Sequence, residues 1–177
     1  AVAQRAGVRQ IGLVPKRRTA LILDAPEGMD PRDWPELDDV SEDFYLKPEA
    51  GKLLASPADE TPMAAQDAQP DEMDIAICID RIQQATTLRV RRIEHSWAGL
   101  RSFVVDRMPV VGFDDEAEGF FWLAGQGGAG IQTSPGLSDA AAALLLGRDW
   151  PSGLTEHGLE AAMLSPARLT TREEFTP

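Results

Sequence analysis

The amino-acid sequence predicts an α+β fold built on an antiparallel or mixed β-sheet. Short runs rich in β-branched and aromatic residues, bounded by proline, glycine and acidic residues, indicate most of the strands. Apolar residues spaced three or four apart after Asp71, and an alanine- and leucine-rich run at 140–146, indicate the helices. A chain made mostly of strands with two well-marked helices is typical of the α+β class.

The first half of the chain is expected to hold most of the sheet. It opens with a short helical stretch that ends at Gly7, where a glycine C-cap fits. A strand is predicted at 17–23, and two short strands at 44–48 and 52–56 flank a turn and predict a hairpin. The amphipathic segment 71–88 predicts a helix whose first residues are acidic, as the helix dipole favours.

The second half adds further strands and a long helix. Residues 89–113 predict one or two long strands bent at Gly99, with another short strand from Pro109 to Phe113. The mostly aromatic segment 119–124 predicts a strand covered on both faces. One more helical turn is expected at 159–163.

Residues 125–136, between the last strand and the body of the long helix, contain five glycines, and most of this segment is expected to be a loop. Such a loop either approaches another group closely or takes positive φ angles. Ser134 as a hydroxyl N-cap and Pro135 as the first helical residue predict the start of the helix. The loop then presents backbone N–H groups to an anion or a planar cofactor, or it serves tight packing alone. Its spacing matches GxGxxG only approximately, and the acidic residue of a dinucleotide site is missing, so it is not a complete mononucleotide-binding fold.

The composition is that of a globular domain with a strongly acidic balance. The 177 residues, 43% of them hydrophobic, suffice for one core, and the formal net charge of −12 argues against nucleic acid as a partner. No apolar run is long enough to span a membrane, and the N-terminus lacks the apolar core of a signal peptide. The single cysteine, Cys78, is expected to be buried, and a chain without internal disulfides fits a reducing, cytoplasmic compartment. Because position 1 is alanine, we expect residues upstream of it.

Few side chains offer chemistry of their own. His95 and His157 are isolated from other metal-ligating residues, so the sequence predicts neither a metal site nor a catalytic side chain. Arg101 lies in an apolar and aromatic segment, where a guanidinium needs a partner. One of the 29 acidic residues is the simplest partner, and a ligand is the alternative. Tyr45, the only tyrosine, is expected to be a half-buried residue of the hairpin.

Long motifs carry a resemblance to a known family. Nearly the whole chain is covered, in order, by the strings PKRRTALI, DFYLKPEAG, SPADETP, TTLRVRRIEHSWAGLRSFVVD, GFFWLAGQGGAGIQTS and EHGLEAAMLSPARL. They resemble the C-terminal half of FAD-dependent amino-acid oxidoreductases of the D-amino acid oxidase superfamily, and among these the D-arginine dehydrogenases. The N-terminal Rossmann half of such enzymes is missing from this sequence. The resemblance therefore implies FAD as the cofactor, an amino acid as the small-molecule substrate, and the Rossmann half of the same enzyme as a partner.

The resemblance also implies residues that bind substrate. Arg101 corresponds to an arginine that grips the substrate α-carboxylate, and Tyr45 to a tyrosine whose hydroxyl helps to hold it. Arg18 corresponds to a second arginine near the substrate, with its neighbour Arg17 as the alternative. Gly128 and Gln132 correspond to positions where a backbone carbonyl and a side-chain amide meet the substrate or the flavin.

The same resemblance places the flavin ring against the glycine-rich loop. The implied cofactor contacts are Gly99, Gly127, Gly128, Ala129, Gly130, Ile131, Gln132 and Thr133. Ala129 departs from the pattern, because a tyrosine is expected there in the D-arginine dehydrogenases, and this leaves the substrate side chain open. An arginine typical of glycine oxidases is replaced by Gly128, which disfavours specificity for small amines.

The implied function is oxidative deamination of a D-amino acid to a 2-oxo acid by hydride transfer to flavin. In this interpretation residues 1–113 form the substrate-binding part, and residues 114–177 form the strand, loop and helix that complete an FAD-binding, Rossmann-like domain. The alternative is a non-catalytic α+β domain or a subunit that needs a separate FAD-binding polypeptide. A membrane or quinone contact is compatible with the sequence but is not indicated by it.

Overall fold

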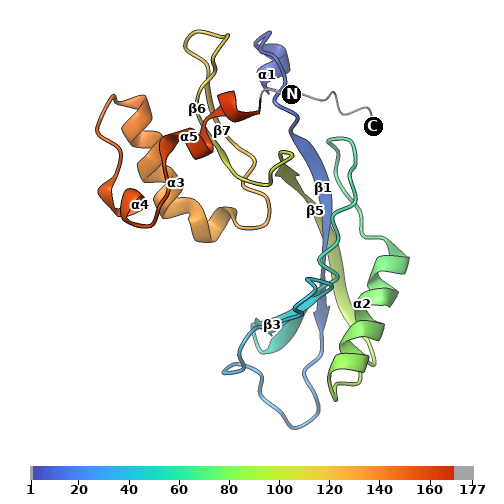
Figure 1. The fold of residues 1–177 in the computed structure, drawn as a ribbon. Coiled ribbons are helices and arrows are strands. Elements are labelled where there is room, and N and C mark those ends of the chain that lie inside the picture. The colour runs from blue at the N-terminus through green and yellow to red at the C-terminus, as the bar shows by residue number, and fades with distance from the viewer. Residues whose placement is uncertain (1, 170–177) are drawn as a thin grey trace. The chain divides into compact units, whose positions relative to one another are not determined.

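The computed structural model describes residues 2–169, and the chain divides into two compact units. Unit 1 comprises residues 1–15 and 101–177, and unit 2 comprises residues 16–100. Each unit contains both strands and helices (Figure 1). The fold is therefore α+β, as predicted. The units are a division by compactness, so the predicted functional division between residues 113 and 114 stays a prediction.

Unit 2 is built on an antiparallel sheet. Its strands are β1 (Val14–Leu23), β2 (Leu37–Asp38), β3 (Tyr45–Glu49), β4 (Lys52–Ser56) and β5 (Ile93–Phe103), in the spatial order β2-β3-β4-β1-β5. The first two residues of β1 and the last three of β5 fall in unit 1. The predicted hairpin is confirmed, because β3 pairs with β4 in antiparallel register from Tyr45 opposite Ser56 to Glu49 opposite Lys52. Its turn places Ala50 and Gly51 at φ angles of 48° and 79°, the sign that tight hairpin turns require.

One face of this sheet packs against α2 (Glu72–Ala85), which lies alongside it in Figure 1. The buried cluster on this face consists of Leu21, Leu23, Phe44, Leu46, Leu53, Ala55, Cys78 and Ile82. Asp71 caps the helix as its sequence position suggested, since its carboxylate accepts hydrogen bonds from the backbone N–H groups of Met73 and Asp74. Because side chains alternate along a strand, Arg18 and Tyr45 belong to the other sheet face.

Cys78 is fully buried beneath this sheet, as predicted. Burial disfavours the charged thiolate and raises the pKa of the thiol to about 12. At neutral pH the side chain is a neutral thiol and acts as a small apolar residue of the core.

Unit 1 is organised around a second, two-stranded sheet. Its elements are α1 (Val2–Arg5), β6 (Val110–Phe113), β7 (Phe121–Ala124), α3 (Gly130–Leu145), α4 (Ser152–Glu156), α5 (Ala161–Leu164) and the 3-10 turn η1 (Pro166–Arg168). The strands pair antiparallel, with Val111 opposite Leu123. Val111 packs in one cluster with Leu137 of α3, and Val110 packs in a different cluster with Trp122. Most of the sheet is thus covered on both faces.

Coverage of β7 is less complete than predicted. Leu123 is 50% exposed and Phe113, at the end of β6, is 47% exposed. β7 has β6 as its one hydrogen-bonded neighbour among residues 2–169, so its other edge is open there. Leu123 is not part of the buried cluster that Val111 forms with Leu137.

The turn between β6 and β7 is fixed by a buried carboxylate. Asp114, 8% exposed, accepts hydrogen bonds from the backbone N–H groups of Glu116 and Ala117, each at 2.9 Å, and from the indole N–H of Trp122 at 2.8 Å. The burial of Asp114 is thus matched by three donors, as a buried charge requires.

The remaining elements mostly follow the sequence. The opening helix ends near Gly7, which has a φ angle of 70°, and α5 accounts for the helical turn expected at 159–163. The segment 89–113 holds β5 as a single long strand, followed by the short strand β6. The helix α4 was not expected.

Candidate functional site

The long helix α3 begins five residues earlier than the sequence predicted. Gly130 is its first residue and Ala129 its N-cap, so the prediction of Ser134 as N-cap and Pro135 as first helical residue is wrong. Both lie inside the helix. The hydroxyl of Ser134 donates to the carbonyl of Ile131 at 2.8 Å. In a regular helix this carbonyl would accept from the backbone N–H of residue 135, but proline has no N–H. This substitute bond explains how the helix accommodates a proline.

The N-terminus of α3 lacks a side-chain cap. Ala129 has no polar side chain, and the first backbone bond of the helix is donated by Thr133 to the carbonyl of Ala129 at 3.0 Å. The preceding N–H groups, those of Gly130, Ile131 and Gln132, have no backbone acceptor within residues 2–169. Ile131 beside them is 93% exposed. This helix end therefore offers N–H donors and an apolar side chain to a ligand.

The glycines of the loop also have local packing reasons. A Cβ on Gly127 would lie 2.5 Å from Cε1 of Phe103, and Gly127 has a φ angle of 53°. A Cβ on Gly128 would lie 3.0 Å from Nη1 of Arg101, and one on Gly130 would lie 3.1 Å from Cβ of Gln126. Tight packing, the alternative left open by the sequence, thus explains these glycines, and the case for a ligand rests on the helix end and on Arg101.

Arg101 is the side chain that the loop positions. Its Nη1 donates to the carbonyl of Gly128 at 3.0 Å, while the backbone N–H of Gly127 donates to the carbonyl of Ser102 at 3.1 Å. β5 and the loop are therefore linked at this point. Within the part of unit 1 that the structure describes, no carboxylate lies within ion-pair distance of this guanidinium. A guanidinium has five N–H donors, so Arg101 keeps donors for another acceptor.

The other two predicted substrate residues lie in unit 2, on the sheet face opposite α2. Tyr45 is half-buried, as expected, at the start of β3. Arg18 is already engaged, because it donates to the backbone carbonyl of Asp59 and to the carboxylate of Glu60, both at 3.0 Å. Its neighbour Arg17 belongs to the opposite face and pairs with Asp59 and Asp74. Only Arg18 therefore shares a sheet face with Tyr45.

The remaining predicted contacts are on the surface of their own units. Gly99 of β5 is exposed, with no neighbour within 4 Å of the position of an added Cβ. Gln132 is exposed in the first turn of α3, and the hydroxyl of Thr133 donates to the carbonyl of Ala129 at 2.8 Å. Ala129 itself is half-buried and presents only a methyl group.

Metal ligands do not gather in the described residues. Nowhere in residues 2–169 do three or more histidine, cysteine, aspartate or glutamate side chains come close enough to hold a metal ion. His95 stacks on Trp97 with ring centroids 5.5 Å apart, and His157 bonds to the carbonyl of Gly153 through Nδ1. Within the same residues, no helix combines the length and the apolar character that crossing a membrane would need.

A family model for FAD-dependent oxidoreductases (DAO) matches residues 2–144. The match covers most of the chain and includes β5, the glycine-rich loop and nearly all of α3. The chain belongs to this family. FAD is the family's cofactor, and the finding agrees with the cofactor implied by the sequence motifs.

Solved structures support the same fold at low sequence identity. L-proline dehydrogenase from P. horikoshii superimposes with a TM-score of 0.73 and 20% identity, over 97% of this chain and 44% of that chain. Glycine oxidase from Geobacillus kaustophilus gives 0.67 and 21%, over 83% and 38%. Iminodiacetate oxidase from Chelativorans sp. BNC1 gives 0.71 and 16%, over 93% and 43%. The chain thus spans about two fifths of the length of these proteins.

The residues present fit part of an FAD site. The unpaired N–H groups at the start of α3 suit the polar, partly negative edge of an isoalloxazine ring, and the exposed Ile131 suits its apolar face. Residues 125–130 have the GxGxxG spacing, but within residues 2–169 no second strand ending in an acidic ribose ligand follows them, as a dinucleotide site requires. The fit is therefore to the ring end of the cofactor.

Sequence reasoning missed the acidic residues that hold Arg17 and Arg18. Asp59 and Glu60 lie in a segment that reads as a polar connector. The carboxylate of Asp59 also accepts from the backbone N–H and the hydroxyl of Thr19, at 2.6 and 3.0 Å. Two adjacent acidic residues directly after the hairpin are the available signal, but sequence alone does not show that they return to the start of β1 or which carboxylate meets which arginine.

Proposed function

We propose that this chain is the C-terminal portion of an FAD-dependent D-amino acid dehydrogenase or oxidase. The observation that carries the proposal is the guanidinium of Arg101, which bonds to the glycine-rich loop and keeps donors without a carboxylate partner in the described part of its unit. The loop leads directly into the α3 N-terminus with its unpaired N–H groups. An anion-binding group and a ring-binding helix end on adjoining segments suit the oxidation of an amino acid by a flavin.

Arg101 is assigned to the substrate α-carboxylate. Its bond to the carbonyl of Gly128 fixes the plane of the guanidinium and leaves the Nε and Nη2 donors for the acid group. Charge-assisted bonds of this kind contribute about 1.5–3 kcal/mol each. The carbonyl of Gly128, proposed as a substrate or flavin contact, thereby also acts as the acceptor that orients the arginine.

Tyr45 and Arg18 are proposed as further substrate contacts on one wall of unit 2, the sheet face opposite α2. They share a sheet face, and the hydroxyl of Tyr45 would help to hold the carboxylate. Arg18 has two of its donors engaged by the segment 59–60, so it would shape this wall more than it would attract the acid group. Gln132 is assigned to the substrate or the flavin from the α3 side.

The flavin ring is assigned to Gly99 and the loop residues 127–133. Bound FAD supplies the hydride acceptor. The N–H groups of Gly130, Ile131 and Gln132 would hold the ring edge and favour negative charge there. The protein's own residues orient the amino acid so that its Cα–H points at the ring, which is a positioning role.

The overall change balances without a catalytic side chain from this part of the chain. The amino acid loses a hydride from Cα and a proton from its amino group and becomes an imino acid. Water then adds to the C=N bond and releases ammonia and a 2-oxo acid. The amino group must be neutral for the hydride to leave, so turnover is expected to rise with pH until the bound amino group is deprotonated.

The proposal also specifies which substrate side chains the site accepts. The motifs favour a relative of the D-arginine dehydrogenases, yet Ala129 stands where a tyrosine is expected. A methyl group in place of a phenol widens the site, so we expect bulky D-amino acids to be accepted as well as D-arginine.

The test is reduction of the flavin by single substrates. The complete protein is mixed without oxygen with D-arginine, with other D-amino acids and with their L-enantiomers, while the visible flavin absorbance is followed. Bleaching by D-amino acids with formation of the 2-oxo acid is the expected result. Bleaching by L-amino acids alone would overturn the D-specificity, and no bleaching by any amino acid would overturn the function.

A subunit that needs a separate FAD-binding polypeptide is the second candidate. No strand that ends in an acidic ribose ligand follows the glycine-rich loop in residues 2–169, so another segment or a second polypeptide would have to supply that ligand. In that case the 177-residue chain purified by itself carries no flavin absorbance, and the mass of the native complex reveals the second polypeptide. A single polypeptide that extends this chain and retains flavin would exclude this candidate.

A further inference from the structure

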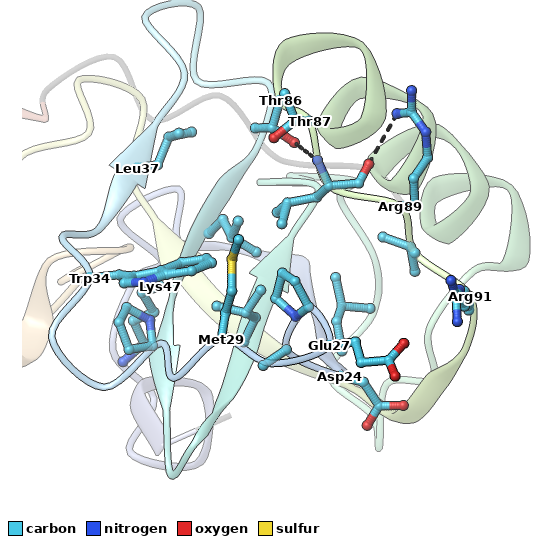
Figure 2. Close-up of a pocket in the computed structure, with 18 of the residues that line it drawn as sticks. Asp24, Glu27, Met29, Trp34, Leu37, Lys47, Thr86, Thr87, Arg89 and Arg91 are labelled. Atoms are coloured by element: carbon cyan, nitrogen blue, oxygen red, sulfur yellow. Dashed lines mark hydrogen bonds between the residues drawn. The ribbon is translucent and has the colours of Figure 1, made fainter.

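Unit 2 contains a cavity that the proposed function does not use. It has a volume of about 620 Å³ and lies where the end of β1, the loop 24–37, β3 and the segment 86–92 meet (Figure 2). Pockets that hold small molecules typically measure about 300–1,000 Å³. The size therefore suits a small organic ligand.

The cavity walls are largely apolar. Leu23, Leu46 and Leu53 from the buried cluster under the sheet form its floor. Trp34 packs against the same cluster, and Met29, 60% exposed, projects into the middle of the space in Figure 2. An aromatic ring and an exposed thioether over an apolar floor suit a ligand with an apolar body.

Charged side chains of both signs, Arg89 and Arg91 together with Asp24 and Glu27, lie on the side of the cavity away from Trp34 in Figure 2. Neither of the two arginines has a carboxylate within ion-pair distance in the described part of unit 2. The guanidinium of Arg89 donates only to the carbonyl of the residue before it, at 3.2 Å. Glu27 is an opposing charge without an ion-pair partner there.

The other charged groups that line the cavity are already paired. Asp24 pairs with Lys52 at 3.0 Å and with Arg92 at 3.7 Å, while Lys47 pairs with Glu49 at 3.3 Å. The unpaired lining groups are thus two cations against one anion, although the whole chain has a formal net charge of −12. This local excess of positive charge favours an anionic ligand.

We propose that this cavity binds a small amphipathic carboxylate. Its apolar body lies against Trp34 and Met29, and its carboxylate lies at the cavity edge that carries the two unpaired arginines, Arg89 and Arg91. The cavity floor belongs to the sheet face that packs on α2, whereas Tyr45 and Arg18 belong to the other face. The carboxylate site is therefore separate from the substrate wall proposed in the same unit, and it stands whether or not the proposed function is correct.

The test compares two ligands that differ only in charge. Binding of 4-phenylbutyrate and of 4-phenylbutylamine to the complete protein is measured by isothermal titration calorimetry at low salt. The carboxylate is expected to bind at one site and the amine about tenfold more weakly, since the amine loses the attraction of two arginines and meets their repulsion. Equal affinity for the two ligands, or no saturable binding of the carboxylate, would overturn the proposal.

Variants locate the binding. The double variant Arg89→Gln/Arg91→Gln should weaken 4-phenylbutyrate about fivefold, and Glu27→Gln should strengthen it by removing the like charge. Arg148→Gln, which removes an exposed arginine of unit 1, is the matched control and should leave the affinity unchanged. An affinity that falls equally in the control, or that falls in Glu27→Gln, contradicts an anion site in this cavity.

Two further variants separate the cavity from the proposed substrate site. Trp34→Ala should weaken binding about tenfold by removing the apolar wall. Trp34 also packs on the core, so Trp34→Ala could fail to fold. Met29→Glu then tests the same cavity, because Met29 is exposed and the new carboxylate should repel the ligand. Arg101→Gln should not change the affinity. Loss of binding in Arg101→Gln with none in Met29→Glu would place the carboxylate at the proposed substrate site and overturn the cavity proposal.

Discussion

The arginines of the two units are held in different ways. In unit 2, Arg17 is 11% exposed and Arg18 is 14% exposed, and both meet carboxylates from the segment 59–74. In unit 1, Arg101 meets the backbone carbonyl of Gly128 and no carboxylate in the described part of that unit. A carboxylate neutralises a guanidinium, whereas a carbonyl fixes its direction and leaves its charge. Arg17 and Arg18 are thereby committed to the fold, and Arg101 keeps its charge for a ligand.

Arg17 should show the largest effect on stability. Replacing it by methionine leaves Asp59, whose side chain is 6% exposed, without its charged partner. Breaking a buried ion pair by removing one member costs about 3–5 kcal/mol, and the bonds from Thr19 to Asp59 reduce this to about 2–4 kcal/mol. Hydrogen exchange of the β1 and α2 amides measures the loss, because Arg17 links these elements through Asp74.

Arg101→Met is the matched control for that measurement. Removing the guanidinium leaves no carboxylate without its partner in the described part of unit 1 and breaks one hydrogen bond to a carbonyl. The free energy of unfolding of the unit should therefore fall by about 1 kcal/mol or less. If Arg101→Met destabilised its unit as strongly as Arg17→Met destabilises unit 2, Arg101 would be a structural arginine and the comparison would fail.

The glycine-rich loop gives the next largest effect. Gly127→Ala places a methyl group 2.5 Å from Cε1 of the buried Phe103 and holds alanine at a φ angle of 53°. We expect a loss of about 2–3 kcal/mol, of which the backbone conformation accounts for about 1 kcal/mol. Thermal unfolding followed through the tryptophans measures it.

Gly147→Ala isolates the steric part of this effect. Gly147 has a φ angle of 61°, close to that of Gly127, but an added Cβ there has no neighbour within 4 Å. The difference between the two variants is therefore the collision with Phe103. Equal losses would mean that Phe103 moves aside without penalty and that the loop is less tightly linked to β5 than the structure indicates.

These positions also show what the sequence could predict. Periodicity located β1, the hairpin of β3 and β4, and the N-cap of α2, because each depends on residues close together in the chain. The start of α3 was misplaced, because Ser134 and Pro135 form a standard N-cap signal whereas the observed start at Gly130 has none. The loop before Gly130 is bonded to Arg101 and Ser102 of β5, and such contacts between distant residues cannot be read from local sequence signals.

The same limit applies to the candidate site. The long motifs identified Arg101 and the loop as belonging together, and the contact with Gly128 confirms that they touch. The engagement of Arg18 by Glu60, the choice between Arg17 and Arg18, and the cavity beside Trp34 depend on side-chain direction and loop path. Strand alternation separates Arg17 from Arg18, but the sheet face that each occupies is fixed only by the partners of β1.

Arg101→Ala tests whether the guanidinium that has no carboxylate partner in the described part of unit 1 binds substrate. In the complete enzyme it should raise KM for a D-amino acid at least about tenfold, since losing one charge-assisted interaction costs about 1.5–3 kcal/mol. Steady-state kinetics with D-arginine measures the effect, and Arg148→Ala is the control for removing a positive charge from unit 1. An unchanged KM would remove Arg101 from the site.

Arg168 tests whether an ion pair with a carboxylate, and not the unit in which an arginine lies, determines whether the arginine stabilises the fold. It lies in unit 1, yet it is paired: Nε donates to Asp106 at 2.7 Å and Nη2 donates to the carbonyl of Met108 at 2.8 Å. Arg168→Met should therefore lower stability, in contrast to Arg101→Met. Because Asp106 is 38% exposed and screened by solvent, we expect only about 1 kcal/mol at neutral pH.

The pH dependence of this last effect separates charge from packing. The hydrogen bond from Arg168 lowers the pKa of Asp106 below its ordinary value of 3.8. The ionised carboxylate thus favours the folded state, so its contribution is complete above that ordinary value and disappears as the pH falls through the lower, folded-state pKa. The difference between Arg168→Met and the unmodified protein in urea unfolding should shrink between about pH 5 and pH 2. A difference that stays constant over this range would mean that Arg168 acts through its aliphatic stem, and Arg168 would then not count as a paired arginine in this comparison.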